Sequence, residues 1–156
     1  MFRPRFHRRV CGFTLIEVLM VVSALAIMAG IVIPQVTEAI EDARHASMLS
    51  NLREISSAIE RYRMEHTGDP PDDLTGHALP QITGNTDAYG NVGNGPGFRY
   101  GSYLQKGMPV NPLNGSAEVF LSATSPPANL DQRVGWVYYP ENGQIWGGLA
   151  RVHGGP

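Results

Sequence analysis

A single carboxylate, Glu17, lies in an otherwise uncharged apolar run of 21 residues from Phe13 to Ile33. An acid within a membrane helix costs about 2.5–3.5 kcal/mol on insertion scales, so Glu17 needs a positively charged partner. No side chain of the run can supply one. Cleavage between Gly12 and Phe13 would create an α-ammonium group one helical turn from Glu17, and the same group on a second copy could reach the same carboxylate. The chemistry predicted here is charge pairing.

The length of this run fits a membrane. As a helix it spans about 30 Å, the thickness of one hydrocarbon core. Residues 1–12 hold four arginines and no acid, whereas residues 35–44 hold three acids and Arg44. Because basic residues mark the cytoplasmic side, we expect the N-terminus in the cytoplasm and everything after Pro34 outside.

The junction of basic leader and apolar run carries the segment Gly12-Phe13-Thr14-Leu15-Ile16-Glu17-Val18-Leu19. It resembles the cleavage and methylation signature of type IV prepilins and type II secretion pseudopilins. This resemblance implies that a prepilin peptidase cuts after Gly12 and methylates the amine of Phe13, and that Glu17 guides docking into a growing filament. Pro34 lies where these subunits commonly carry a helix-breaking proline.

Two other readings of the leader remain open. A secretory signal peptide also has a basic start and an apolar stretch, and residues 23–26 offer small side chains for a signal peptidase. An uncleaved membrane anchor has the same composition. Both leave Glu17 unexplained, and the apolar run continues beyond the alternative cleavage site.

Composition limits the function of the exported part. Loss of residues 1–12 leaves 144 residues with eight Lys and Arg against fourteen acids, a side-chain charge of −6, which argues against nucleic-acid binding. Cys11 leaves with the leader, so no disulfide is expected. The five histidines show no metal-ligand spacing, and no catalytic set is visible. We expect no enzymatic activity.

Beyond Pro34 the apolar pattern becomes periodic, which predicts an amphipathic helix. Its expected buried face comprises Ile40, Ala43, Leu52, Ile55, Ile59 and Tyr62. Gly68, Pro70 and Pro71 predict a stop, so that one long helix runs from about Phe13 to His66. Pro34 removes one helical hydrogen bond, and with Gly30 one turn earlier it predicts a bend or local melting.

The rest of the chain reads as a long loop followed by β structure. Residues 69–107 are rich in Gly, Pro, Asn and Asp, and the loop at 90–95 is expected to be flexible rather than phosphate-binding. Scattered apolar residues are expected to pin this loop to the helix: Leu74, Leu79, Ile82, Tyr89, Phe98, Tyr100, Tyr103 and Leu104. Strands are predicted at 119–121, 134–139 and 144–146, the last two forming a hairpin across residues 140–143. A small antiparallel sheet with Trp136 or Trp146 facing inward would cover the helix, an α+β fold.

Two further segments, Tyr103–Gly115 and Gly135–Tyr138, resemble the small, major-type pseudopilin of type II secretion. This implies a lollipop-shaped subunit with the long helix in the filament centre. The parts expected are a cleaved leader (1–12), a transmembrane or filament-core helix (13–34), an amphipathic continuation (35–66) and a loop-rich head (67–156). The family's acidic calcium loop is not evident at the C-terminus, so no cofactor is expected with confidence, although Asp87, Asp131 and Glu141 remain possible calcium ligands.

The sequence therefore predicts a structural subunit of a type II secretion pseudopilus in the bacterial inner membrane. The partners implied by the resemblance are further copies of the chain, the prepilin peptidase, other pseudopilins, a membrane platform and a secretion ATPase. The alternatives are a type IV pilin or minor pilin for adhesion, motility or DNA uptake, and an anchored periplasmic binding module or enzyme.

Overall fold

The computed structural model describes residues 13–128 and 134–148. The predicted leader with Gly12, the candidate ligand Asp131 and the C-terminal residues from 149 on lie outside the described residues. The chain divides into two compact units, Met1–Glu41 and Asp42–Pro156, which we call the amino-terminal unit and the carboxy-terminal unit. Each is described by itself.

One long helix, α1 (Leu15–Glu65), accounts for all the regular structure among the described residues of the amino-terminal unit. The predicted helix from about Phe13 to His66 is thereby confirmed. Two of its hydroxyls bond within the helix, since those of Ser23 and Thr37 donate to the carbonyls of Leu19 and Ile33. Pro34 lies inside α1 and the helix continues through it, so the chain does not melt there. A bend at this residue stays a prediction.

The part of α1 in the carboxy-terminal unit buries one face. Its buried residues are Ile55, Ala58, Ile59 and Tyr62, which include three of the predicted stripe. Leu52 is partly buried, whereas Ile40 and Ala43 are exposed, so the prediction was wrong for these two. Both precede Met48, the first α1 residue that packs against the core.

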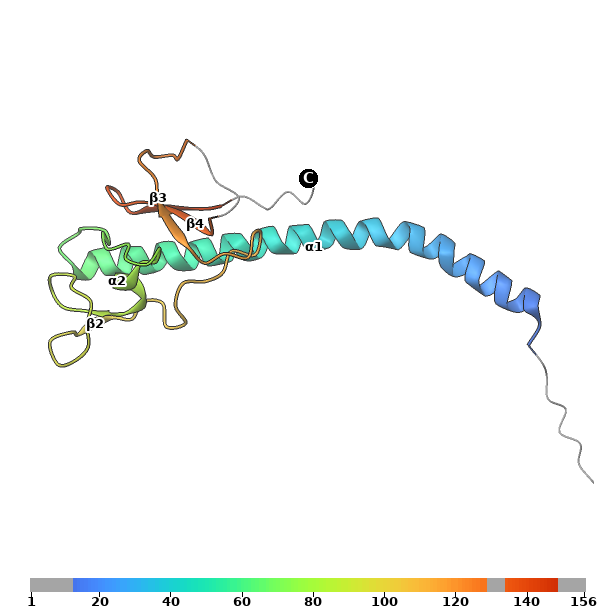
Figure 1. Ribbon diagram of the computed structural model, residues 1–156, viewed down its shortest axis with the longest axis horizontal. Coiled ribbons are helices and arrows are strands. Elements are labelled where there is room, and N and C mark those ends of the chain that lie inside the picture. The colour runs from blue at the N-terminus through green and yellow to red at the C-terminus, as the bar shows by residue number, and fades with distance from the viewer. Residues whose placement is uncertain (1–12, 129–133, 149–156) are drawn as a thin grey trace, which may run out of the picture. The chain divides into compact units, whose positions relative to one another are not determined.

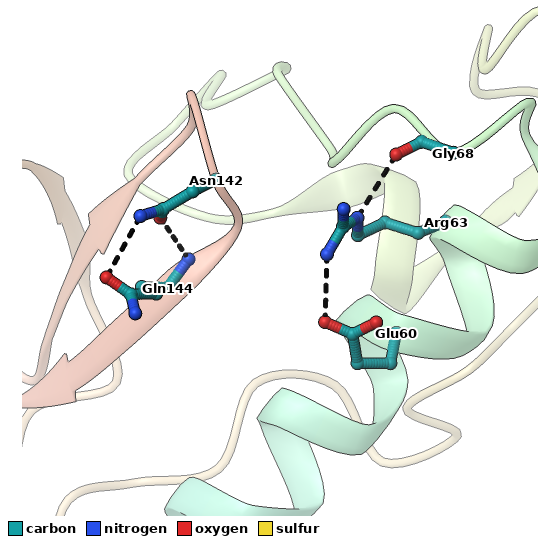
Figure 2. A network of polar contacts seen from close by, with 5 residues as sticks. All are labelled: Glu60, Arg63, Gly68, Asn142 and Gln144. Atoms are coloured by element: carbon teal, nitrogen blue, oxygen red, sulfur yellow. Dashed lines mark hydrogen bonds and ion pairs between the residues drawn. The ribbon is translucent and has the colours of Figure 1, made fainter.

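The end of α1 is fixed by backbone conformation and hydrogen bonds. Thr67 adopts a left-handed conformation with φ 59°, and the N–H of Gly68 donates to the carbonyl of Arg63 at 2.9 Å. This is the bonding pattern of a Schellman cap, which satisfies a carbonyl left free at the helix end. The Arg63 guanidinium adds a second tie, donating to the Gly68 carbonyl at 3.1 Å (Figure 2). The predicted stop after His66 is confirmed.

Two small sheets lie in the carboxy-terminal unit. In the segment predicted as a loop, a short helix α2 (Pro80–Thr83) is followed by β1 (Asn85–Thr86), which pairs antiparallel with β2 (Tyr100–Gly101). The second sheet has the order β3–β4–β5, made of β3 (Val119–Leu121), β4 (Trp136–Tyr139) and β5 (Gln144–Gly147). Figure 1 shows β3 and β4 alongside the last part of α1. The α+β class is confirmed.

The register of the second sheet corrects one expectation. The β4–β5 hairpin is antiparallel as predicted, with Tyr139 opposite Gln144, but β3 pairs with β4 in parallel, with Val119 opposite Trp136. The sheet is therefore mixed rather than wholly antiparallel. A parallel pair needs a crossover of about a dozen residues or more, and the segment 122–135 provides that length.

The core of the carboxy-terminal unit joins α1 to both sheets. Trp136 is fully buried and its indole N–H donates to the Pro109 carbonyl at 2.7 Å, whereas Trp146 is only half-buried. The Tyr138 hydroxyl donates to the Pro71 carbonyl at 2.8 Å. Of the predicted loop pins, Leu79, Ile82, Tyr103 and Leu104 are buried, but Tyr89 is 91% exposed and is not a pin.

A buried asparagine ties the segment before β3 to this sheet. The side-chain amide of Asn111 donates to the carbonyls of Gly135 at 2.8 Å and Gly148 at 3.0 Å, which flank the β4–β5 hairpin. Its side-chain oxygen accepts the N–H of Leu113 at 3.0 Å. Asn111 thus closes its own turn and holds both ends of the hairpin.

Candidate functional site

The start of α1 holds the predicted assembly residue in a helix cap. The Glu17 Oε2 accepts both the backbone N–H and the hydroxyl of Thr14, each at 2.9 Å, and the Thr14 hydroxyl accepts the Glu17 N–H at 3.3 Å. This reciprocal arrangement is a capping box, which satisfies free N–H groups at the first turn. The role of Thr14 was not predicted, although a threonine followed three residues later by glutamate is the signature of such a cap.

The cap leaves part of the Glu17 carboxylate for another donor. Both bonds from Thr14 go to Oε2, and within the described residues no hydrogen bond to Oε1 occurs. Phe13, directly before the cap, is 78% exposed. If the chain were cut before Phe13, the new α-ammonium would adjoin the residue that already contacts Glu17. Within the described residues, the cap thus leaves one oxygen of the Glu17 carboxylate without a hydrogen bond.

The amino-terminal unit presents apolar side chains on every side. Its described residues are all exposed, including the large apolar ones: Phe13, Leu15, Ile16, Val18, Leu19, Met20, Val21, Val22, Leu25, Ile27, Met28, Ile31, Val32, Ile33, Val36 and Ile40. In the described chain, α1 is the one helix long and apolar enough to cross a membrane. An exposed apolar surface of this size is typical of a membrane or protein interaction site.

The candidate calcium ligands have other contacts. The Asp87 carboxylate accepts the N–H groups of Tyr89 and Asn91 and the side-chain amide of Asn91. These bonds, above all that from the Asn91 side chain, lower the pKa of Asp87. Glu141 accepts the hydroxyl of Tyr139. Within residues 13–128 and 134–148, no group of three or more His, Cys, Asp or Glu side chains is arranged to hold a metal ion.

His66, the buried histidine of the described residues, has structural partners. Its Nδ1 lies 2.9 Å from the Tyr62 carbonyl, and its Nε2 lies 2.9 Å from the Asp87 carbonyl and 3.1 Å from the Thr86 hydroxyl. The ring also stacks on Tyr62 at 4.0 Å. These contacts join the end of α1 to the residues at and after β1.

Comparison with known proteins finds two similarities. Residues 7–33 match the model of the prokaryotic N-terminal methylation motif. The chain is also 28% identical to the type II secretion system core protein G of Pseudomonas aeruginosa. The 125 aligned residues cover 80% of this chain and 82% of that protein. No solved structure matches the chain. The resemblance to prepilins and type II secretion pseudopilins is thereby confirmed.

Proposed function

From the premise that this chain is similar to type IV prepilins and, over most of its length, to a type II secretion core protein G, we propose that it is a structural subunit of a type II secretion pseudopilus. It would polymerise at the bacterial inner membrane and support protein export. We expect neither catalysis nor a required cofactor.

One observation carries this proposal: an exposed apolar helix that begins with one acid held in a cap. A simple membrane anchor would gain only the helix cap from Glu17, while the acid makes insertion less favourable. In a filament the same helices would leave the lipid and surround one another. The acid would then be tolerated only where a cation meets it.

The predicted sites acquire their roles within this proposal. A prepilin peptidase would cut between Gly12 and Phe13 on the cytoplasmic side and methylate the Phe13 amine, which keeps its positive charge. That ammonium, on the same or a neighbouring copy, would pair with Glu17 and so select the register of docking. Repetition of a head-to-tail contact that does not close produces an open helical filament.

The arrangement in the cell follows from the charge pattern and the relatives. Residues 1–12 would lie in the cytoplasm and be removed, residues 13–34 would span the membrane or form the filament core, and residues 35–66 would continue into a periplasmic head of residues 67–156. Pro34 would permit a bend at the boundary between the two helix segments. Other pseudopilins, the membrane platform and the secretion ATPase are the proposed partners.

The decisive experiment separates the charge of Glu17 from its role in the cap. Glutamine also fits the capping box, so Glu17→Gln keeps an acceptor for Thr14 while removing the charge. We expect this variant to insert and to be cleaved, but to reduce filament yield at least tenfold, because the charge that pairs with the Phe13 ammonium is gone. Filaments are counted by electron microscopy after overproduction.

Thr14→Ala is the matched control, because it removes the capping hydroxyl and leaves the charge. We expect its filament yield to stay close to that of the wild type, since a lost cap costs only about 1 kcal/mol of helix stability and the pairing charge is retained. If Glu17→Gln assembles normally while Thr14→Ala fails, the cap rather than charge pairing explains Glu17, and the register mechanism is wrong.

A further inference from the structure

A cleft of about 500 Å³ opens beyond the end of α1 in the carboxy-terminal unit. It is bounded by the last residues of α1, the segment that follows the helix and the turn after β1, which contributes residues 88 and 89. None of the sites assigned above uses this cleft. Its lining combines carboxylates with aromatic rings.

Tyr62 lines the cleft with a hydroxyl that has no hydrogen-bond partner among the described residues, although the residue is only 3% exposed. Burial and the charges of Asp72, Asp69 and Asp87 raise the pKa of this hydroxyl to about 12. The hydroxyl therefore keeps its proton and lies in a region of negative potential. Among the described residues no fully buried side-chain oxygen or nitrogen lacks a partner, so the Tyr62 hydroxyl is accessible from the cleft and can meet a ligand there.

Two carboxylates of the cleft retain unused oxygen atoms. The Asp72 Oδ1 accepts the side-chain amide of Gln81 at 3.0 Å, and the Asp69 Oδ2 accepts the Thr67 hydroxyl at 3.2 Å. Within the described chain, the other oxygen of each has no hydrogen-bond partner, and neither acid forms an ion pair. The two acids carry two negative charges with room for a donor.

The nearby basic side chains are directed elsewhere. Arg63, on the last turn of α1, pairs with Glu60 at 3.0 Å and donates to the Gly68 carbonyl, as Figure 2 shows. Both ring nitrogens of His66 lie within 2.9 Å of backbone carbonyls. Neither residue neutralises the carboxylates by direct contact.

The rim adds an aromatic surface. Tyr89 is 91% exposed, and its backbone N–H donates to the Asp87 carboxylate at 2.8 Å, which fixes the turn that carries the ring. Cationic groups bind both carboxylates and the faces of tyrosine rings. An exposed ring beside unpaired carboxylates therefore favours a planar or compact organic cation.

We propose that this cleft binds the guanidinium or ammonium group of an organic cation. Such a group would donate to Asp69 and Asp72, meet the Tyr62 hydroxyl at the floor and lie against Tyr89. The cation belongs either to a basic side chain of a neighbouring copy or to a free amine. Binding of a side chain from a neighbouring copy rests on the proposed function, because it requires a filament. Binding of a cation in the cleft does not depend on that function.

The test uses the full-length processed chain, labelled with ¹⁵N, in detergent micelles at low salt. Ethylguanidinium is the probe, and ethylurea, which has nearly the same shape without the charge, is the control. We expect ethylguanidinium to shift the amide signals of residues 66–72 and 87–91 with an apparent Kd on the order of 1–10 mM, as for a weak exposed site. Ethylurea should leave these signals unchanged. Equal shifts with both probes, or none with ethylguanidinium, would overturn the proposal.

Three variants locate the binding. Asp69→Asn and Asp72→Asn should each raise the Kd for ethylguanidinium at least threefold, and Tyr62→Phe, which keeps the buried ring, should raise it twofold or more. Glu118→Gln removes an equal charge from an exposed acid elsewhere on the same unit and should change the Kd less than 1.5-fold. If Glu118→Gln weakens binding as much as the aspartate variants, the effect is general charge attraction and the cleft is not the site.

Assembled filaments distinguish the two sources of the cation. If a neighbouring copy fills the cleft, wild-type filaments should bind no further ethylguanidinium, and the Asp69→Asn, Asp72→Asn double variant should dissociate at lower salt. If a free amine is the natural ligand, filaments should bind the probe as the isolated chain does. Failure to form filaments at all would refute the proposed function while the titration of the isolated chain still decides the cleft.

Discussion

Replacing Asn111 by alanine should lower the free energy of unfolding of the carboxy-terminal unit by about 3 kcal/mol. The side chain is fully buried and makes three hydrogen bonds, two to the carbonyls of Gly135 and Gly148 and one from the N–H of Leu113. Each such bond contributes about 1 kcal/mol, and its removal leaves a buried group without a partner. Because domain stability is only about 5–15 kcal/mol, this loss is a large fraction of the total.

Asn111→Asp should be more destabilising than Asn111→Ala near neutral pH. A carboxylate keeps the acceptor for Leu113 but directs negative charge at the two carbonyls that the amide served. A buried charge without a partner is costlier than a cavity of the same size. Acidification should reduce the difference, since a protonated carboxyl can donate one hydrogen bond.

Urea unfolding of the full chain in detergent, followed by tryptophan fluorescence, measures these effects. Trp136 reports on the same region, because its indole donates to the Pro109 carbonyl two residues before Asn111. With a slope of about 1–3 kcal/mol per molar urea, the midpoint for Asn111→Ala should fall by about 1–3 M. Asn94→Ala, at an exposed loop position, is the control. Equal midpoints for the two variants would refute the role assigned to Asn111.

Two further predictions concern the carboxy-terminal unit. Thr67→Asn should raise the unfolding free energy of this unit by about 0.5–1 kcal/mol, because asparagine tolerates the left-handed conformation (φ 59°) better than a β-branched residue. A lower thermal midpoint than that of the wild type would contradict this. Stability should also fall above pH 10, because burial raises the pKa of Tyr62 to about 12 and raises that of Tyr138, whereas unfolded tyrosines ionise near 10. The contribution is complete below pH 10 and is lost as the pH rises through about 12. Tyr62→Phe should make the fall less steep in fluorescence titrations, and an unchanged slope would show that this hydroxyl does not contribute.

The elements with strong local signals could be predicted from the sequence. The apolar run, the later stripe of Ile55, Ile59 and Tyr62, and the residues at 68–71 define α1 almost to its observed ends. The turn composition at 140–143 likewise predicts the β4–β5 hairpin. Both patterns depend on neighbouring residues, which is why periodicity and turn chemistry suffice.

The misses depend on the path of the chain through space. The parallel pairing of β3 with β4 joins strands that are far apart in the sequence, and local pattern does not contain that information. Tyr89 is an aromatic residue, which suggests a core position, but its side chain is exposed on the turn that Asp87 fixes. The role of Asn111 also depends on carbonyls more than twenty residues away.

The candidate site shows the same division. Glu17 stands out because an acid in an apolar run is chemically costly, and its spacing from Thr14 is a local signal that was available. The proposed cleft is different, since Asp69 and Tyr89 come together only through the packing of α1 with the turn after β1. Sequence proximity alone makes the aspartates look like an ordinary solvated loop.

The intact mass and N-terminal sequence of the chain recovered from membranes show directly whether the proposed cleavage and methylation take place. We expect a chain that begins at Phe13 and carries one additional methyl group on its amine. A chain that begins at Met1, or one cut near Ala26, would contradict it, because Glu17 would then have no ammonium partner of the kind proposed.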